Sequence, residues 1–111
     1  MFLAGGAVAA VAPASTAFVH RKALMLSTID LIWTEVDDVA VVADNESWLA
    51  AFHAAMQPFT SDKCFQHFAD GAETDYLRAY YGENLERLVE IKKHYDPDNL
   101  FRFQQSIPLS L

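Results

Sequence analysis

Basic residues and cysteine are scarce in this sequence. Eight Lys and Arg residues stand against fifteen Asp and Glu residues, which gives a formal net charge of −7. A surface of that sign repels nucleic-acid phosphates and anionic lipid headgroups, so we expect neither nucleic acid nor a membrane as a partner. The single cysteine, Cys64, excludes an internal disulfide and fits a reducing compartment.

The sequence also lacks a hydrophobic run long enough to cross a bilayer. The apolar start, residues 1–17, is interrupted by Gly5, Gly6 and Pro13 and is shorter than a bilayer span. No Lys or Arg precedes its apolar part, whereas a signal peptide normally carries one there. We therefore interpret this segment as a buried strand and keep a signal peptide as the alternative.

The spacings typical of metal and phosphate sites are missing as well. The four histidines are scattered, with no H-x-x-x-H or C-x-x-C pair, so no metal site is predicted. The sequence contains no P-loop and no G-x-G-x-x-G, and Gly5 and Gly6 precede a predicted strand rather than a helix. The chain alone is therefore not expected to hold a dinucleotide tightly.

The residues that are present predict a small globular α+β fold. Hydrophobic residues make up 52% of the 111 residues, enough for a core of marginal stability. Three β-compatible runs fill the first third, at residues 7–11, 16–21 and 24–33. The last run is apolar on both alternating faces, which is typical of a strand covered on both sides. We expect these runs to form a small antiparallel sheet.

Three helices are predicted after this sheet. Residues 38–56 carry Val41, Trp48 and Phe52 at helical spacing, residues 74–81 end at Gly82, and residues 83–95 follow. The last of these helices has the clearest apolar stripe, formed by Leu85, Leu88, Ile91 and Tyr95. Between the first and second helices, residues 64–68 are predicted to form a short extended run.

Three linked motifs occupy the last third. Residues 79–88 read AYYGENLERL, residues 92–101 read KKHYDPDNLF and residues 102–108 read RFQQSIP. Together they closely resemble the C-terminal element of berberine-bridge-enzyme-like FAD-linked oxidases, which has a YYG-x-N-x-x-RL helix start, a K-x-x-YDP-x-N-x-F turn and a QSIP tail. The resemblance extends upstream to about Gly5. Within the motifs, Asn84, Asp96 and Asn99 are interpreted as caps of helices and turns.

This resemblance implies a vanillyl-alcohol-oxidase-type flavoprotein that oxidises a small organic substrate by hydride transfer to FAD. It places Phe65, His67 and Phe68 where a Tyr-x-Asn-Tyr/Phe strand of the family contacts the flavin. The two phenylalanines can stack on a ring but cannot accept a proton, and His67 takes the place of the Asn donor. Ala9 and Ala10 stand where some relatives carry an acidic base, so no catalytic residue is assigned.

The resemblance also implies a division of the chain and a partner. Residues 1–70 correspond to the end of the substrate-domain strands and a helix, and residues 71–111 to the berberine-like C-terminal element, within one structural unit. The family binds most of its flavin through an N-terminal half, so we expect this chain to act on a small-molecule substrate only with such a half, or as a homo-oligomer. The alternative is a non-catalytic binding or structural module. A small enzyme using Cys64 or a histidine is a third hypothesis.

Overall fold

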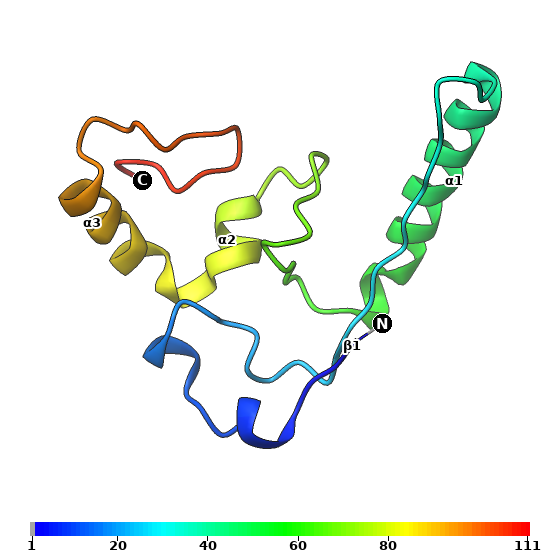
Figure 1. The fold of residues 1–111 in the computed structure, drawn as a ribbon. Helices are drawn as coiled ribbons and strands as arrows, with labels where there is room; N and C mark the ends of the chain where they lie inside the picture. Colours follow the sequence, from blue (N-terminus) through cyan, green and yellow to red (C-terminus); the bar gives the residue numbers. More distant parts are fainter. Residues whose placement is uncertain (1) are drawn as a thin grey trace. The chain divides into compact units, whose positions relative to one another are not determined.

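The computed structural model describes residues 2–111, which divide into two compact units. Residues 27–62 form the first unit, and residues 2–26 and 63–111 together form the second. The α-helices are α1 (Val39–Met56), α2 (Tyr76–Tyr81) and α3 (Leu85–Tyr95) (Figure 1). Short 3₁₀ turns occupy Gly6–Val8, Pro13–Ser15, Gln57–Phe59 and Gly82–Asn84. Within residues 2–111, no helix has the length and apolar character needed to cross a membrane.

The three predicted helices are confirmed, with boundaries that follow from local chemistry. α1 begins after Asp38, whose carboxylate accepts a hydrogen bond from the Ala40 N–H at 2.8 Å and so caps the helix. It ends at the predicted Gln57–Pro58 step, where a 3₁₀ turn follows. α2 ends at Gly82, whose φ of +48° is a conformation that glycine adopts without steric cost. α3 begins at Leu85 because residues 82–84 form a 3₁₀ turn first.

The predicted antiparallel sheet is not confirmed. In the described part of the chain, pairing is limited to β1 (Phe2–Leu3) and β2 (Met25–Leu26), which run antiparallel with Phe2 opposite Leu26. The prediction of a strand at residues 7–11 is wrong, because Gly5 and Gly6 adopt positive φ and lead into a 3₁₀ turn. Residues 16–21 and 27–33 have no ladder partner among residues 2–111, and a strand requires one.

The apolar faces also differ from those predicted. In the segment expected to be covered on both sides, Leu24 is 80% exposed and Ile32 is 92% exposed. On α1, Val41 and Trp48 are exposed, whereas Val42, Leu49 and Phe52 are half-buried. On α3, Val89 is the buried residue, while Ile91 and Tyr95 of the predicted stripe are exposed. Much apolar surface therefore faces solvent in the chain by itself.

The buried core lies in the second unit and contains as many polar as apolar side chains: Ala79, Tyr80 and Val89 with Asn84, Asp96 and Gln105. The Tyr80 hydroxyl accepts a hydrogen bond from the Asp70 N–H at 3.1 Å and donates one to Gln105 Oε1 at 3.0 Å. Gln105 Nε2 in turn donates to the carbonyls of Asp70 and Glu73, at 2.6 and 3.2 Å. These bonds fix the returning C-terminal segment beside α2 (Figure 1).

Asn84 has a different role from the predicted helix cap. It precedes α3, but its side chain makes no capping bond there. Instead, Asn84 Nδ2 donates to the Pro13 carbonyl at 3.1 Å, a bond between residues 71 positions apart. Asn84 therefore connects the start of α3 to the N-terminal part of the second unit.

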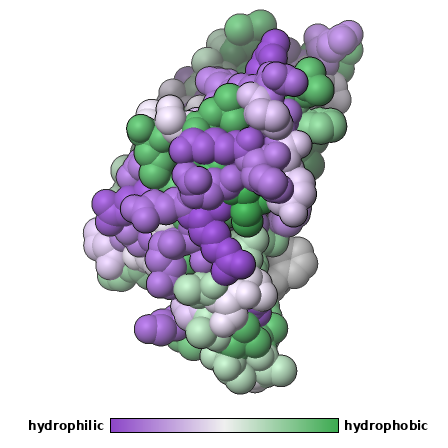
Figure 2. All heavy atoms as spheres, turned by 90° about the vertical axis from the view of Figure 1, so that its left-hand side faces the viewer, coloured by the Kyte–Doolittle hydropathy of each residue, from purple (hydrophilic) through white to green (hydrophobic). Residues whose placement is uncertain are grey.

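Asp96 is confirmed as a cap. Its carboxylate accepts hydrogen bonds from the Leu100 and Phe101 N–H groups at 2.7 and 3.1 Å, and it pairs with Lys92 one helical turn earlier. The hydrogen bond from Lys92 is the main reason why the pKa of Asp96 lies below its usual value. The solvent side of α3 carries exposed charges, including Lys93 paired with Glu90 at 2.9 Å. Figure 2 shows hydrophilic side chains gathered on the face that includes α3.

Candidate functional site

Five ring-bearing side chains from two distant segments form one aromatic cluster in the second unit. We define this cluster as Phe18, His20, Phe65, His67 and Phe68. Phe65 is at its centre, with its ring centroid 4.8 Å from that of His67 and 6.0 Å from that of Phe68. The centroids of Phe18 and His20 each lie 5.9 Å from that of Phe65. The structure thus brings together all three predicted flavin-contacting residues.

A turn, and not the predicted extended run, produces this arrangement. The Phe68 N–H donates to the Phe65 carbonyl at 2.8 Å, which closes a turn over residues 65–68. In an extended strand, Phe68 would point to the face opposite Phe65 and His67. The turn removes that alternation and allows all three side chains to join one cluster.

The cluster has an inner edge and an open edge. Phe18, His20 and Phe65 are half-buried, whereas His67 is exposed and Phe68 is 48% exposed. At the inner edge, the Arg21 guanidinium carbon lies 4.8 Å from the centroid of the Phe18 ring, within the range of a cation–π interaction. A ligand therefore has access to the cluster from the side of His67 and Phe68.

His20 is a member of this cluster that we did not predict as a site residue. Burial lowers the pKa of His20 below its usual value, the positive charge of Lys63 lowers it further, and the Gln66 side chain opposes the shift. His20 Nε2 and Gln66 Oε1 are both buried and have no hydrogen-bond partner in the described chain. The available signal was a histidine inside an otherwise apolar segment, two residues after Phe18.

The open edge of the cluster fits the ring system of FAD. Phe65 and Phe68 offer aromatic rings for stacking, and the exposed His67 offers an imidazole N–H as a donor. When bound, a flavin supplies the capacity to accept a hydride. None of these three side chains is a carboxylate or a phenol, so the cluster residues named for the flavin supply packing and hydrogen bonding.

Cys64 and His67, the residues of the thiol-enzyme hypothesis, each have another neighbour. The Cys64 thiol approaches Glu73 Oε2 at 3.9 Å, and the His67 ring lies against Phe65. Across residues 2–111, no group of three or more His, Cys, Asp or Glu side chains is placed to hold a metal ion.

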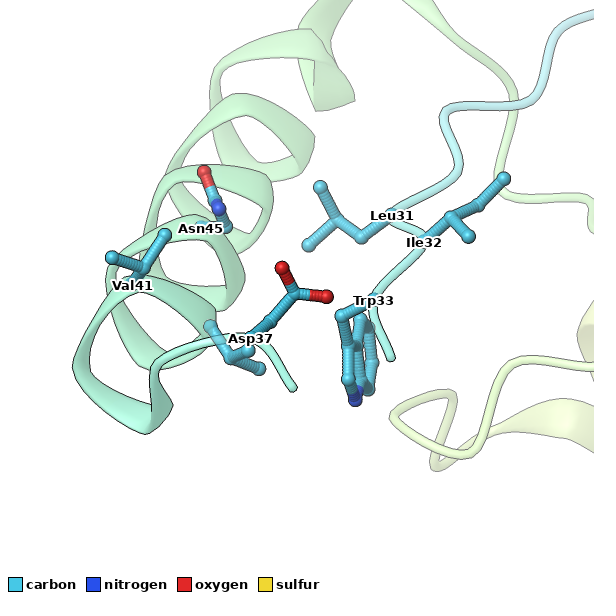
Figure 3. A pocket seen from close by; sticks show the side chains of 7 residues that line it. Leu31, Ile32, Trp33, Asp37, Val41 and Asn45 are labelled. Carbon is cyan, nitrogen blue, oxygen red and sulfur yellow. The ribbon is translucent and has the colours of Figure 1, made fainter. Parts of the chain in front are cut away.

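Each unit also contains a shallow hollow. In the first unit, a hollow of about 80 Å³ lies between α1 and the preceding segment, lined by Leu31, Ile32, Trp33, Asp37, Val41, Val42 and Asn45 (Figure 3). Asp37 accepts two hydrogen bonds from Thr34, at 2.6 Å from N–H and 2.9 Å from Oγ1, and these bonds lower its pKa. The Asp37 carboxylate therefore stabilises the turn that precedes α1.

The hollow in the second unit, of about 120 Å³, is lined by Ala14, Ser15, Thr16, Ala17, Asn84, Arg87, Leu88 and Ile91.

Comparison with known proteins gives one consistent result. Residues 64–108 match the family model described as "Berberine and berberine like". The chain is 36% identical over 94% of its length to the uncharacterised FAD-linked oxidoreductase YgaK of Bacillus subtilis, and 35% identical over 96% to YvdP of the same organism. It is 30% identical over 94% of its length to berberine bridge enzyme-like 1 of Arabidopsis thaliana. No solved structure matches the chain.

The chain matches only a small part of each relative. The chain spans 22% of YgaK, 23% of YvdP and 22% of berberine bridge enzyme-like 1. The matched segment includes the three motifs of the last third and the residues of the aromatic cluster. Residues 64–108 therefore carry the berberine and berberine-like element, as the linked YYG, YDP and QSIP motifs indicated, and the chain is similar to a fragment of FAD-linked oxidoreductases.

Proposed function

We propose that this chain forms the substrate-side end of an FAD-dependent oxidoreductase, which oxidises a small organic substrate by hydride transfer to flavin. The observation that carries the proposal is the aromatic cluster. Phe65, His67 and Phe68, chosen from the sequence as flavin contacts, lie within one group of rings that is open on one side. The FAD-linked names of the bacterial relatives support the same cofactor.

In this proposal the cluster binds and orients the flavin ring. Phe65 and Phe68 pack against it, and His67 donates a hydrogen bond to one of its carbonyl groups. An aromatic contact of this kind contributes about 0.5–1.5 kcal/mol beyond the area it buries. Since neither phenylalanine can accept a proton, the group that takes up the substrate proton lies outside these three positions.

The proposal also assigns a partner to the exposed apolar surface. When a flavin-binding N-terminal half is joined to the chain, residues 24–33 pair as a strand of a larger substrate-domain sheet, which that half completes. Leu24 at 80% exposure and Ile32 at 92% exposure support this assignment, because strands in such sheets are covered on both faces. The chain by itself is then inactive, and it acts when joined to that half.

The flavin content of the purified chain tests this proposal. The chain is mixed with excess FAD and passed through a gel-filtration column, first alone and then with the separately produced N-terminal portion of YgaK. We expect retained flavin only in the mixture, and flavin reduction by substrate only there. The double variant Phe65→Ala/Phe68→Ala should reduce this retention, whereas Phe101→Ala, at a ring that is 79% exposed, should not.

Two results would contradict the proposal. Flavin retained by the chain alone would remove the need for a partner. A folded chain that joins the N-terminal portion, yet leaves flavin reduction at the level of that portion alone, would support a non-catalytic structural module instead. The elution volume of the chain alone also reports whether it forms a homo-oligomer.

A further inference from the structure

His20 occupies the inner edge of the aromatic cluster, against the residue at its centre. Its ring centroid lies 5.9 Å from that of Phe65 with the planes at 90°, and 5.3 Å from that of Phe18 at 74°. Phe18 and Phe65 meet each other at 5.9 Å and 84°. The three rings therefore form a triangle of edge-to-face contacts, an arrangement that favours defined ring orientations.

We infer that His20 is a positioning residue: its neutral ring holds Phe65 in the orientation in which Phe65 faces the flavin. This inference rests on the proposed function, since it assigns a role to a neighbour of the proposed flavin contact. His20 Nε2 is buried and has no hydrogen-bond partner in the described chain. Burial makes the protonated ring costly at this position, although the Gln66 side chain opposes this effect, so we expect protonation to displace the ring or open the triangle.

The charged side chains near His20 are both positive. Lys63 lowers the pKa of His20, in addition to the larger effect of burial. On the neighbouring backbone, Arg21 places its guanidinium over Phe18, and His67 lies across Phe65. Lys63 and Arg21 are both positively charged, so neither stabilises a positive charge on His20, and the Gln66 side chain only partly offsets the effect of burial.

The sign of the pH effect follows from the lowered pKa. A histidine whose pKa is lower in the folded state than its ordinary value of 6.5 favours the folded arrangement above that value. This contribution is lost as the pH falls through the folded pKa. The orientation of Phe65 should therefore be kept at neutral pH and lost in mild acid, together with the flavin contact that depends on it.

NMR titration of the full isotope-labelled chain tests the inference directly. The ring signals of Phe65 and His20 are followed from about pH 8 to about pH 5, the range in which histidines titrate. We expect both to change with one shared midpoint below 6.5. His20→Phe keeps an aromatic ring and removes the titrating group. In this variant the plot of the Phe65 ring signal against pH, the Phe65 profile, should therefore be flat.

Two other variants serve as controls for the neighbouring histidines. His67 also contacts Phe65, at 4.8 Å, and is the rival source of a pH effect. His67→Asn should leave the Phe65 profile in place, and so should His94→Asn, at an exposed histidine whose ring contact is with Tyr95. A Phe65 profile that disappears in His67→Asn and persists in His20→Phe would overturn the inference, as would a Phe65 signal that does not respond to pH.

Lumiflavin, the isoalloxazine ring without the ribityl chain and its phosphates, provides the second measurement, which is made on the chain joined to the N-terminal portion of YgaK. We expect its dissociation constant to rise about three- to tenfold in His20→Ala at neutral pH, as for the loss of one aromatic pair. The same rise should appear in the unmodified chain in acid and be absent in His20→Phe. No lumiflavin binding at neutral pH would count against the proposed flavin site alone, because the coupling of His20 to Phe65 is judged by NMR. A lumiflavin dissociation constant that stays unchanged in His20→Ala as well as in His20→Phe would refute the positioning role.

Discussion

Replacing Tyr80 with phenylalanine is the sharpest test of how the second unit is held together. The Tyr80 side chain is 2% exposed, and its hydroxyl joins the Asp70 N–H to Gln105 Oε1. Phenylalanine keeps the ring in place and removes only the hydroxyl. The substitution therefore isolates the hydrogen bonds from the packing of the core.

The expected loss follows from what remains after the hydroxyl is gone. Gln105 is 7% exposed, so its Oε1 stays buried without a donor, at a cost of about 1–3 kcal/mol. Asp70 is exposed, and its N–H can bind water instead, so its contribution is small. With a urea m-value of about 1 kcal/mol/M for so small a protein, the midpoint of unfolding should fall by about 1–3 M.

Urea unfolding followed by circular dichroism of the helices measures this change. Tyr95→Phe is the matched control, because the Tyr95 side chain is 78% exposed and the same atom is removed. Gln105→Leu combined with Tyr80→Phe should destabilise by less than the sum of the two single variants, since both disrupt one shared bond. A Tyr80→Phe midpoint equal to that of Tyr95→Phe would refute the structural role of the network.

Three further substitutions address other parts of the second unit. Gly82→Ala should lower the free energy of unfolding by about 1–3 kcal/mol, because Gly82 has a φ of +48° and a Cβ there would lie 3.0 Å from Val19 Cγ2. Thermal unfolding measures this loss, and an unchanged midpoint would contradict the steric argument. Asp96 has a pKa lowered from 3.8, so its stabilising effect is present above that value and is lost as the pH falls through the folded pKa. Unfolding midpoints measured from about pH 6 to about pH 2 should thus fall less steeply in Asp96→Asn, and equal slopes would argue against the cap. Cys64→Ala should leave flavin retention with the N-terminal portion unchanged, and a large loss would revive the thiol hypothesis.

The helices were predictable because their signals are local. Asp38 stands next to the apolar run that it caps, and Gly82 marks the end of α2. The positions that close the turn after α3 also lie within six residues of one another, from Asp96 to Phe101. Signals of this range are satisfied within the chain itself, whatever surrounds it.

The strands were not predictable in the same way, because a strand depends on a neighbour. Residues 24–33 have the composition of a covered strand, but only Met25 and Leu26 find a ladder partner in the described chain. Residues 7–11 have a hydrophobic pattern but contain three alanines, which have low β-propensity, and they follow two glycines at positive φ. The hydrophobic pattern therefore identifies an apolar segment, but it does not show whether a hydrogen-bonding partner is present to make that segment a strand.

Three of the five residues of the candidate site were predicted, but the geometry of the site was not. Phe65, His67 and Phe68 came from the resemblance, and the structure places all three in one cluster. The turn that joins them was missed, because no glycine or proline marks residues 65–68. His20 was missed for a different reason: its contact with Phe65 spans 45 positions, and no local pattern reports a contact over that distance.

The residues that identify the family and the residues proposed to meet the flavin have different physical roles. Tyr80, Asn84, Asp96 and Gln105, from the three linked motifs, are buried and bonded to backbone or to one another. They are polar because each must satisfy backbone groups where α2, α3 and the C-terminal segment meet, and an apolar residue there would leave those groups unpaired. A change at one of them should thus alter stability before it alters chemistry. The exposed side chains of His67 and Phe68, at the open edge of the aromatic cluster, have no comparable role in the core, so substitutions there should affect stability less.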